Sequence, residues 1–531
     1  MVSRLAGVPL VGANLMAAWL LPALAFCALP GIVPRHGGVR GLLAALVSGF
    51  ALATLALGMG EAARRIGGTE PVLGIPVAAR FVIGAAFAVL ALGAALVAPW
   101  RLALAAALGG GAAALLGAPA LAPPWVLALA ALALWSRAPV ALVLIAAVAL
   151  TDSPLGPATL AQSVLRGLSG YVLLAVPLFI LAAALLVASD VGARILMAAR
   201  ALAPRRRTAL GEANIWASLL FGGISASSIA DAATSARLLV PAMVAEGYGA
   251  ARASAISAAA AILPNVMPPS IALLLAAAAS DISVGRLWLA GAIAAPVLAV
   301  ALYGAVRLTP PQRPEPGEPA VPAHGARLGA LRNLAPVGVA ALAIVGALRF
   351  GIVTAVEAGL VAVALSAVYA KRASGWRALA AALASAARQS GRVAILIAAA
   401  APVAFVVAAS GFDAKSLLPV ASGPLAALVV AALVALLIGT VLDAGAAILL
   451  LLPILVPALA AAGVTPVHGA LTLCLALLIG GLTPPVGILI LVVKEITGAQ
   501  KVYLAVLPYL AALLLALSCV VLVPLAARFF V

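Results

Sequence analysis

The sequence predicts an all-α protein that crosses a membrane many times and forms an inverted repeat with two re-entrant hairpins and two broken helices. Three observations support this prediction. Of the 531 residues, 66% are hydrophobic and only 8% are charged, too few charges for a surface that faces water. Apolar runs of about 20 residues recur along the chain, the length of a helix that spans a bilayer. Short polar motifs interrupt these runs at matching places in the two halves.

The charged residues and the potential metal ligands exclude several classes of protein. The net charge of +17 would suit a nucleic-acid partner in a soluble protein, but Lys and Arg gather here in short segments between apolar runs. That distribution is typical of loops on the cytoplasmic side of a membrane. The three histidines and three cysteines lack HxxxH, HExxH or CxxC spacing, and no DDxxD motif occurs. We therefore expect no enzyme, no resident cofactor and no nucleic-acid partner.

The chain before the first polar motif consists of membrane helices. Residues 1–121 hold about four apolar runs. Arg137 and Pro139 then interrupt an apolar stretch over 122–151, which predicts two short helices or one broken helix. Residues 171–190 form a full span. The basic segment 194–207 that follows is the strongest cytoplasmic signal in the sequence.

The first polar motif, residues 221–231, predicts a re-entrant hairpin over 212–244 with its tip at 222–231. Hydrocarbon offers no partner to a free backbone group or a carboxylate, so such a tip is energetically costly. We therefore expect it to have a function. A broken span over 253–280 and a span over 287–306 follow. The proline-rich segment 307–332 is typical of an exposed linker. It divides a first repeat, 122–306, from a second repeat, 333–531.

The second half has the same order of elements. Thr354 and Glu357 have capping-box spacing at the start of one of its helices. Its expected elements are spans over 334–350 and 355–370, a basic amphipathic segment at the cytoplasmic surface over 371–392, a span over 393–410, a hairpin over 424–460 with its tip at 439–445, a broken span over 469–493 and a last span over 503–529.

The orientation of the two hairpins follows from the basic segments. Alternating sides places four segments in the cytoplasm: 194–207, 307–332, 371–392 and 494–501. The first hairpin then opens inward and the second outward, which makes the halves an inverted repeat. The first arm of the second hairpin, Leu425–Ile438, would measure about 21 Å against a bilayer core of ~30 Å, so it cannot span.

A double proline interrupts each broken span. Proline removes an N–H donor and so frees the carbonyl four residues earlier; the carbonyls concerned are those of Pro264 and Asn265, freed by Pro268 and Pro269, and those of Gly480 and Gly481, freed by Pro484 and Pro485. Broken helices use such carbonyls to hold Na⁺ and use half-helix N-termini to hold carboxylates. A proline kink satisfied by its neighbours is the alternative, and the repetition of the motif favours a binding site.

Polar groups beside the breaks complete the candidate site. In the first half they are Asn214, Gly223, Ser225, Ser227, Ser228, Asp231, Pro264, Asn265, Pro268, Pro269 and Ser270. In the second half they are Gly439, Thr440, Asp443, Gly480, Gly481, Thr483, Pro484, Pro485 and Gly487. We expect Na⁺ to bind carbonyl and hydroxyl oxygens near Ser225, Ser228, Gly439 and Thr483. Asp231 and Asp443 fit helix caps and direct ligands equally well.

These motifs resemble the large membrane subunit of tripartite ATP-independent periplasmic (TRAP) transporters. The resemblance runs from about residue 122 to the C-terminus, and it is carried by the segments 211–231, 243–248, 268–270, 351–358, 442–448, 453–457, 466–468 and 481–487. Residues 34–98 are similar, more faintly, to the small membrane subunit of the same family. Residues 1–100 would then be small-subunit-like helices, 101–121 a linker helix, and the chain a natural fusion.

The resemblance implies an elevator-type importer in the bacterial inner membrane. It implies that a sodium gradient drives the import of a carboxylate, such as a C4-dicarboxylate, keto acid or sugar acid. It also implies that a periplasmic substrate-binding protein delivers this substrate. The alternative is a secondary carrier of anions that works without a binding protein.

Overall fold

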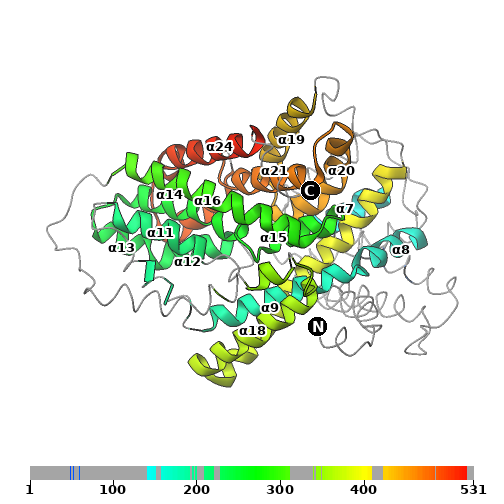
Figure 1. The fold of residues 1–531 in the computed structure, drawn as a ribbon, viewed down its shortest axis with the longest axis horizontal. Coiled ribbons are helices and arrows are strands. Elements are labelled where there is room, and N and C mark those ends of the chain that lie inside the picture. The colour runs from blue at the N-terminus through cyan, green and yellow to red at the C-terminus, as the bar shows by residue number, and fades with distance from the viewer. Residues whose placement is uncertain are drawn as a thin grey trace, which may run out of the picture. The chain divides into compact units, whose positions relative to one another are not determined.

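The fold was obtained as a computed structural model. It describes residues 140–150, 157–189, 208–220, 228–310, 343–348, 350–409, 423–484 and 486–522, together with isolated positions elsewhere. Every regular element in these ranges is a helix (Figure 1). Gly223, Ser225, Ser227 and Pro485, the linker 311–332 and nearly all of residues 1–139 lie outside the described residues.

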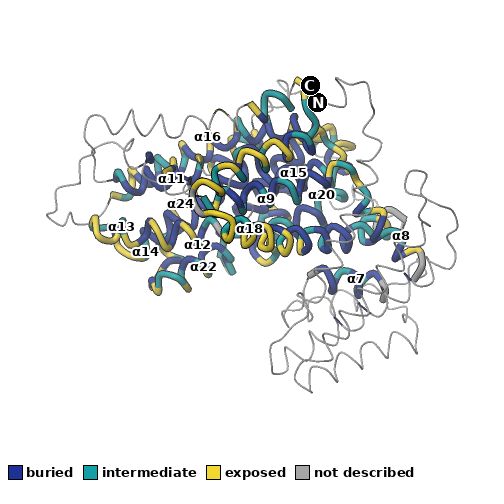
Figure 2. The backbone as a smooth tube through the Cα atoms, turned by 90° about the horizontal axis from the view of Figure 1, so that it is seen from below, coloured by how far each residue is buried: buried dark blue, intermediate teal, exposed yellow. Residues whose placement is uncertain are grey.

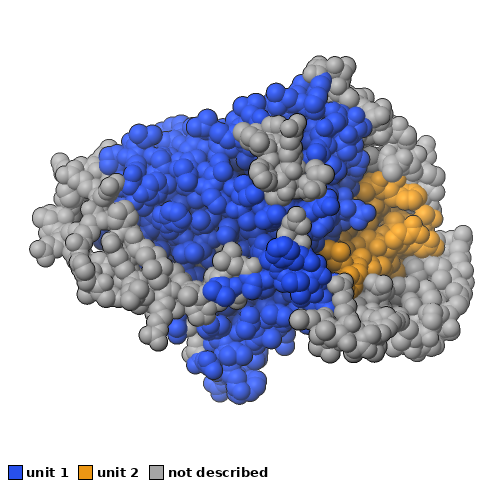
Figure 3. Space-filling model, in the orientation of Figure 1, with its two compact units in different colours: residues 1, 175–386, 414–531 blue, residues 2–174, 387–413 orange. Residues whose placement is uncertain are grey.

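The chain divides into two compact units (Figure 3). The larger unit is formed by residues 175–386 and 414–531, and the smaller by residues 2–174 and 387–413. In the smaller unit the described helices are α7 (Val140–Leu150), α8 (Pro157–Leu168), the short 3₁₀ helix η1 (Tyr171–Leu174) and the last part of α18 (Ala355–Ala409). A Cβ added to Gly167 of α8 would lie 2.4 Å from the Cβ of Ala401, so these two helices cross closely there.

The larger unit contains the two predicted polar regions. Its first half consists of α9 (Ala175–Val187), α11 (Ala209–Leu220), α12 (Ser228–Leu238), α13 (Val240–Ala245), α14 (Ala250–Ala260), η2 (Leu263–Asn265), α15 (Ile271–Ala279) and α16 (Val284–Leu308). Its second half contains the first part of α18, then α19 (Pro424–Gly439), α20 (Ala444–Ala461), α21 (Pro466–Gly480), α22 (Ile488–Thr497), α23 (Val502–Ala505) and α24 (Leu507–Leu522).

The two halves of this unit exchange packing partners. Helix α12 packs on α14, the first part of its own broken helix, and on α22, the last part of the other one. Helix α20 packs on α21, the first part of its own broken helix, and on α15, the last part of the other one. Figure 1 shows α15, α20 and α21 close together, and Figure 2 shows α15 and α20 largely buried. The helix that follows each break therefore packs on a hairpin helix from the other half.

Both broken spans occur where the prolines predicted them. The first separates α14 from α15 over residues 261–270, and the second separates α21 from α22 over residues 481–487. Helix α19 has 16 residues, or about 24 Å, which is still shorter than the ~30 Å bilayer core. Among the described helices, Val284–Leu308, Gly375–Val406 and Ala444–Ala461 are long and apolar enough to cross a membrane.

Helix α18 differs from the sequence prediction. A separate amphipathic segment over 371–392 and a span over 393–410 were expected. Two helices meet at Gly375 (φ +70°), close to the expected start of that segment, but the second helix continues past residue 392 to Ala409. Alanine, the best helix former, dominates the sequence after the corner, which favours an unbroken helix. The predicted capping box is confirmed: the Thr354 N–H donates to Glu357 Oε2 at 2.7 Å, and the Glu357 N–H donates to Thr354 Oγ1 at 3.3 Å.

Candidate functional site

The first break is closed by Ser270, the N-cap residue of α15. Its hydroxyl donates to the Asn265 carbonyl and accepts from the Leu273 N–H at 3.1 Å. Its own carbonyl accepts from the indole N–H of Trp288 at 3.1 Å, and Trp288 is fully buried. One serine thus satisfies a carbonyl freed at the break and also caps the half-helix that follows.

Asp231 connects the first hairpin to this break. It lies in the first turn of α12, where the helix dipole favours a negative charge. One of its carboxylate oxygens accepts a hydrogen bond of 3.4 Å from the amide of Asn265, a residue of η2 that is 5% exposed. Ser228 is the first residue of the same helix. Asp231 therefore holds the break against α12, and a direct role in ion binding stays a prediction.

The second hairpin turns over Thr440–Asp443. Asp443 is the N-cap residue of α20, and its side chain accepts from the Gly445 N–H at 3.1 Å. The Thr440 hydroxyl donates to the Leu437 carbonyl at 2.7 Å. A capping role for Asp443 is thus confirmed, and ion binding by its remaining lone pairs stays a prediction.

Two glycines bring this turn against the second break. A Cβ added to Gly439 would lie 2.4 Å from the Leu477 carbonyl oxygen, and one added to Gly480 would lie 2.4 Å from the Leu436 carbonyl oxygen. Helices α19 and α21 therefore cross backbone to backbone, which only residues without a side chain permit. Gly487 opens α22 in the left-handed region (φ +56°) and supplies no side-chain cap.

The carbonyls expected to be free at the breaks already have donors in three of four cases. Asn265 O accepts from Ser270, Gly480 O accepts from the Thr483 N–H at 2.8 Å, and Gly481 O accepts from the Leu489 N–H at 3.1 Å. The Thr483 hydroxyl donates to Ile479 O at 3.0 Å. A carbonyl oxygen has two lone pairs, so each retains one for a cation. Most of these carbonyls are thus hydrogen-bonded without an ion and still offer a lone pair.

Asn214 serves a different purpose from the other predicted residues. It is fully buried; its amide donates to Ser257 of α14 at 2.8 Å, and its oxygen accepts from Ser235 of α12 at 3.0 Å. A weaker contact of 3.8 Å joins its amide to the sulfur of Met243. Through these contacts the Asn214 side chain holds α11 to α12, α13 and α14. Asn214 therefore positions the first hairpin.

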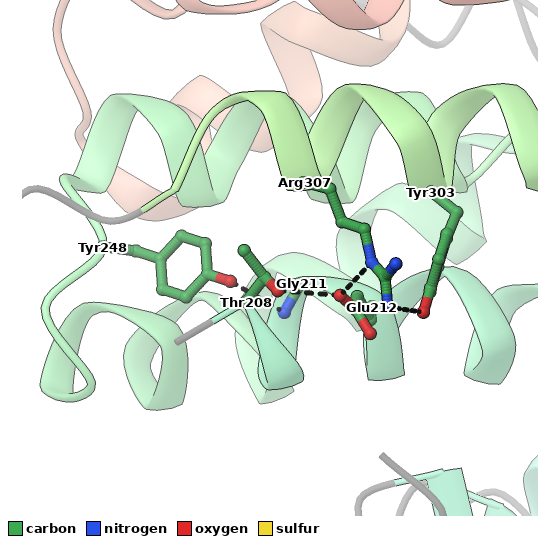
Figure 4. Close-up of polar contacts among 6 residues, drawn as sticks. All are labelled: Thr208, Gly211, Glu212, Tyr248, Tyr303 and Arg307. Atoms are coloured by element: carbon green, nitrogen blue, oxygen red, sulfur yellow. Dashed lines mark hydrogen bonds and ion pairs between the residues drawn. The ribbon is translucent and has the colours of Figure 1, made fainter. Parts of the chain in front are cut away.

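A cluster at the start of α11 was missed by the sequence reasoning (Figure 4). The Glu212 side chain is 0% exposed, and its Oε1 accepts from the Thr208 hydroxyl at 2.7 Å and from Arg307 Nε at 3.1 Å. Arg307, whose side chain is 40% exposed, stacks over the ring of Tyr303 at 4.4 Å and donates to its hydroxyl. Within the described residues, Glu212 Oε2 makes no hydrogen bond.

This cluster fixes α11 to the end of α16. Tyr248 adds to it by accepting from the Gly211 N–H at 3.2 Å, and burial raises the pKa of this phenol well above its usual value. The signal in the sequence was Thr208 four residues before Glu212, a spacing that places both on one helix face. The sequence gives no such signal for Arg307. The predicted linker begins at this residue, whereas α16 continues to Leu308.

Apolar helices interrupted in matching places by proline breaks are typical of an integral membrane permease. The sequence profile of the family described as "Tripartite ATP-independent periplasmic transporter, DctM component" matches residues 125–526, and the chain belongs to this family. It is therefore a secondary transporter and a multi-pass protein of the inner membrane.

Named relatives agree with this assignment. The sialic acid TRAP transporter large permease protein SiaM of Vibrio cholerae is 31% identical over 68% of this chain and 87% of the relative. The 2,3-diketo-L-gulonate TRAP transporter large permease protein YiaN of Escherichia coli is 27% identical over 58% of this chain and 74% of the relative. Among solved structures, the YdaH transporter of Alcanivorax borkumensis gives a TM-score of 0.45 at 17% identity, over 70% of this chain and 88% of that one.

Proposed function

We propose that this permease imports an organic acid, that a sodium gradient drives the import, and that a periplasmic substrate-binding protein delivers the acid. The names of its relatives support the substrate class. SiaM is named for sialic acid, YiaN for 2,3-diketo-L-gulonate, and a third relative from Vibrio cholerae for C4-dicarboxylates. All three are carboxylates, and the third relative is 33% identical over 28% of this chain and 34% of its own length.

The exchange of packing partners between the two halves carries the proposal. It packs the helix that follows each break on a hairpin helix of the other half, and this crossed packing supports a site to which both halves contribute. Carbonyls with a spare lone pair and the hydroxyls of Ser228 and Thr483 are suitable ligands for Na⁺. The N-terminus of α22 has no side-chain cap and is suited to a carboxylate.

The membrane potential sets a lower limit on the number of sodium ions. Importing a dianion against a negative-inside potential costs about 4.6 kcal/mol per 100 mV, at about 2.3 kcal/mol for each charge. Two Na⁺ cancel this cost for a dianion, and two already provide net drive for a monoanion. We therefore propose at least two sites, one near Ser225 and Ser228 and one near Gly439 and Thr483.

Transport in proteoliposomes tests the coupling. The full chain is reconstituted with its substrate-binding protein, and uptake of labelled organic acid is followed with and without an inward sodium gradient. We expect uptake only with sodium, and a higher sodium concentration at half-maximal rate in Thr483→Ala, because one oxygen ligand is lost. Equal uptake in both conditions would contradict the sodium proposal. Sodium-driven uptake in the absence of any binding protein would favour the alternative, a carrier that works alone.

The mechanism and the N-terminal region are further parts of the proposal. The two halves form an inverted repeat that moves the site across the bilayer as an elevator, and residues 1–100 replace a separate small subunit. The family profile begins only at residue 125, which leaves room for such a unit before it. We expect this chain to be the sole membrane component that uptake requires. Uptake that appears only when a separate small subunit is added would contradict the fusion.

A further inference from the structure

The corner of α18 at Gly375 is an exposed feature that the transport site does not use. Two limbs of the helix meet there, residues 355–374 and the segment that begins at Trp376. Both limbs are anchored to α9, because Ala370 from the first and Ala382 from the second share an apolar cluster with Leu185. The corner is therefore held in a defined place on the larger unit.

Three cations surround this corner. Lys371 and Arg372 precede Gly375, Arg377 follows it, and all three side chains are exposed. The Lys371 ammonium lies 4.7 Å from the centre of the Trp376 ring. The sequence contains no Asp or Glu between Glu357 and Asp413, and none of the three cations forms an ion pair with a described residue. We call Lys371, Arg372, Trp376 and Arg377 the basic corner.

An apolar strip continues from the basic corner along the second limb. Trp376 is 68% exposed and Leu383 is 57% exposed. They are seven residues apart, so they lie on one face of the helix two turns apart, whereas Ala382 faces the protein. Much of α18 is drawn as exposed in Figure 2. The limb thus presents cations and apolar side chains outward at the same time.

We infer that the basic corner binds the headgroups of anionic phospholipids at the surface of the bilayer. Tryptophan is favoured at the boundary between headgroups and acyl chains, where its ring is apolar and its N–H is polar. Basic residues beside such an apolar strip are attracted to the negative charge of anionic lipid. Trp376 and Leu383 lie at that boundary, and the three cations face the phosphates. An acidic protein surface would match the cations but would leave the apolar strip exposed.

Brominated lipids test this inference, because they quench only a tryptophan that they touch. The full chain is reconstituted in phosphatidylcholine vesicles with a small fraction of either brominated phosphatidylglycerol or brominated phosphatidylcholine. The difference between wild type and Trp376→Phe isolates the signal of Trp376. We expect stronger quenching of Trp376 by the brominated phosphatidylglycerol, and a smaller excess at high salt because salt screens the charges.

Charge variants provide the control. Each cation removed lowers the preference for anionic lipid by about fivefold. We expect this loss in Arg377→Gln, and a complete loss in Lys371→Gln/Arg372→Gln/Arg377→Gln. Arg286→Gln removes another exposed arginine, at the start of α16, and is expected to leave the preference unchanged. Equal quenching by both lipids, no quenching by either, or equal effects of Arg377→Gln and Arg286→Gln would each overturn the inference.

Discussion

At the scale of single residues, Ser270 performs two tasks at once at the first break. Its hydroxyl caps α15 and also donates to the carbonyl of Asn265. The side-chain amide of Asn265 in turn donates to Asp231. Asn265 is buried, and a buried polar atom that loses its partner is costly. The geometry of the break is therefore set largely by one small side chain.

Substitution of Ser270 tests this role. Ser270→Ala removes a helix cap, which typically costs about 1 kcal/mol, and leaves the Asn265 carbonyl without its donor. We expect a lower midpoint of thermal unfolding in detergent. Ser280→Ala is the matched control at the other end of α15, because the Ser280 hydroxyl is buried but has no hydrogen-bond partner in the described residues. Similar losses in the two variants would contradict the role assigned to Ser270.

The pair of Glu212 and Arg307 is expected to respond unequally to substitution. Arg307→Gln leaves the fully buried carboxylate without its cation, a loss of about 3 kcal/mol. Glu212→Gln leaves an arginine that water can hydrate, because its side chain is 40% exposed, and costs about 1 kcal/mol. Chemical unfolding of both variants and of the double variant measures these values. A double variant less stable than Arg307→Gln would show that the buried charge is not the cause.

At the scale of elements, the crossing of α19 and α21 depends on the absence of two side chains. Gly480→Ala places a methyl group 2.4 Å from the Leu436 carbonyl oxygen, a contact that backbone atoms cannot relieve without moving the helix. We expect the free energy of unfolding to fall by roughly 1 to 3 kcal/mol. We also expect a loss of uptake, because the second tip moves away from the break. Gly304→Ala in α16 meets no atom within 4 Å and is expected to be neutral or stabilising. Normal uptake by Gly480→Ala would contradict this role for the crossing.

The elements also show how far the sequence predicts this structure. Both breaks, the shortness of α19 and the capping box before α18 follow from local rules about proline, glycine and helix ends, and all are confirmed. Local rules did not predict the roles of Asn214 and Glu212, because these depend on partners more than 20 residues away, such as Ser257 and Arg307. Nor did they predict the unbroken helix after Gly375, because basic residues mark a surface and do not end a helix.

At the scale of the whole molecule, the exchange of partners makes each half incomplete without the other. Helix α12 packs on α22 of the other half, and α15 packs on α20 of the other half. Expression of the chain as two pieces, cut between Gly317 and Glu318 in the proline-rich linker, tests this dependence. We expect each piece alone to be degraded and the two together to give a stable complex, measured by protein level and gel filtration in detergent. A first piece that is stable alone would contradict the mutual dependence.

The crossed contacts also imply communication between the two proposed sodium sites. A cation that orders the first break stiffens α15 and therefore α20, which begins at the second tip. A cation at the second break stiffens α22 and therefore α12, which begins at the first tip. Binding at either position lowers the entropic cost of binding at the other, and thermodynamic linkage requires the effect to be equal in both directions. For the proposed pair of sodium sites the architecture thus favours positive cooperativity, in which partly loaded states are rare and uptake responds to sodium over a narrow range of concentration.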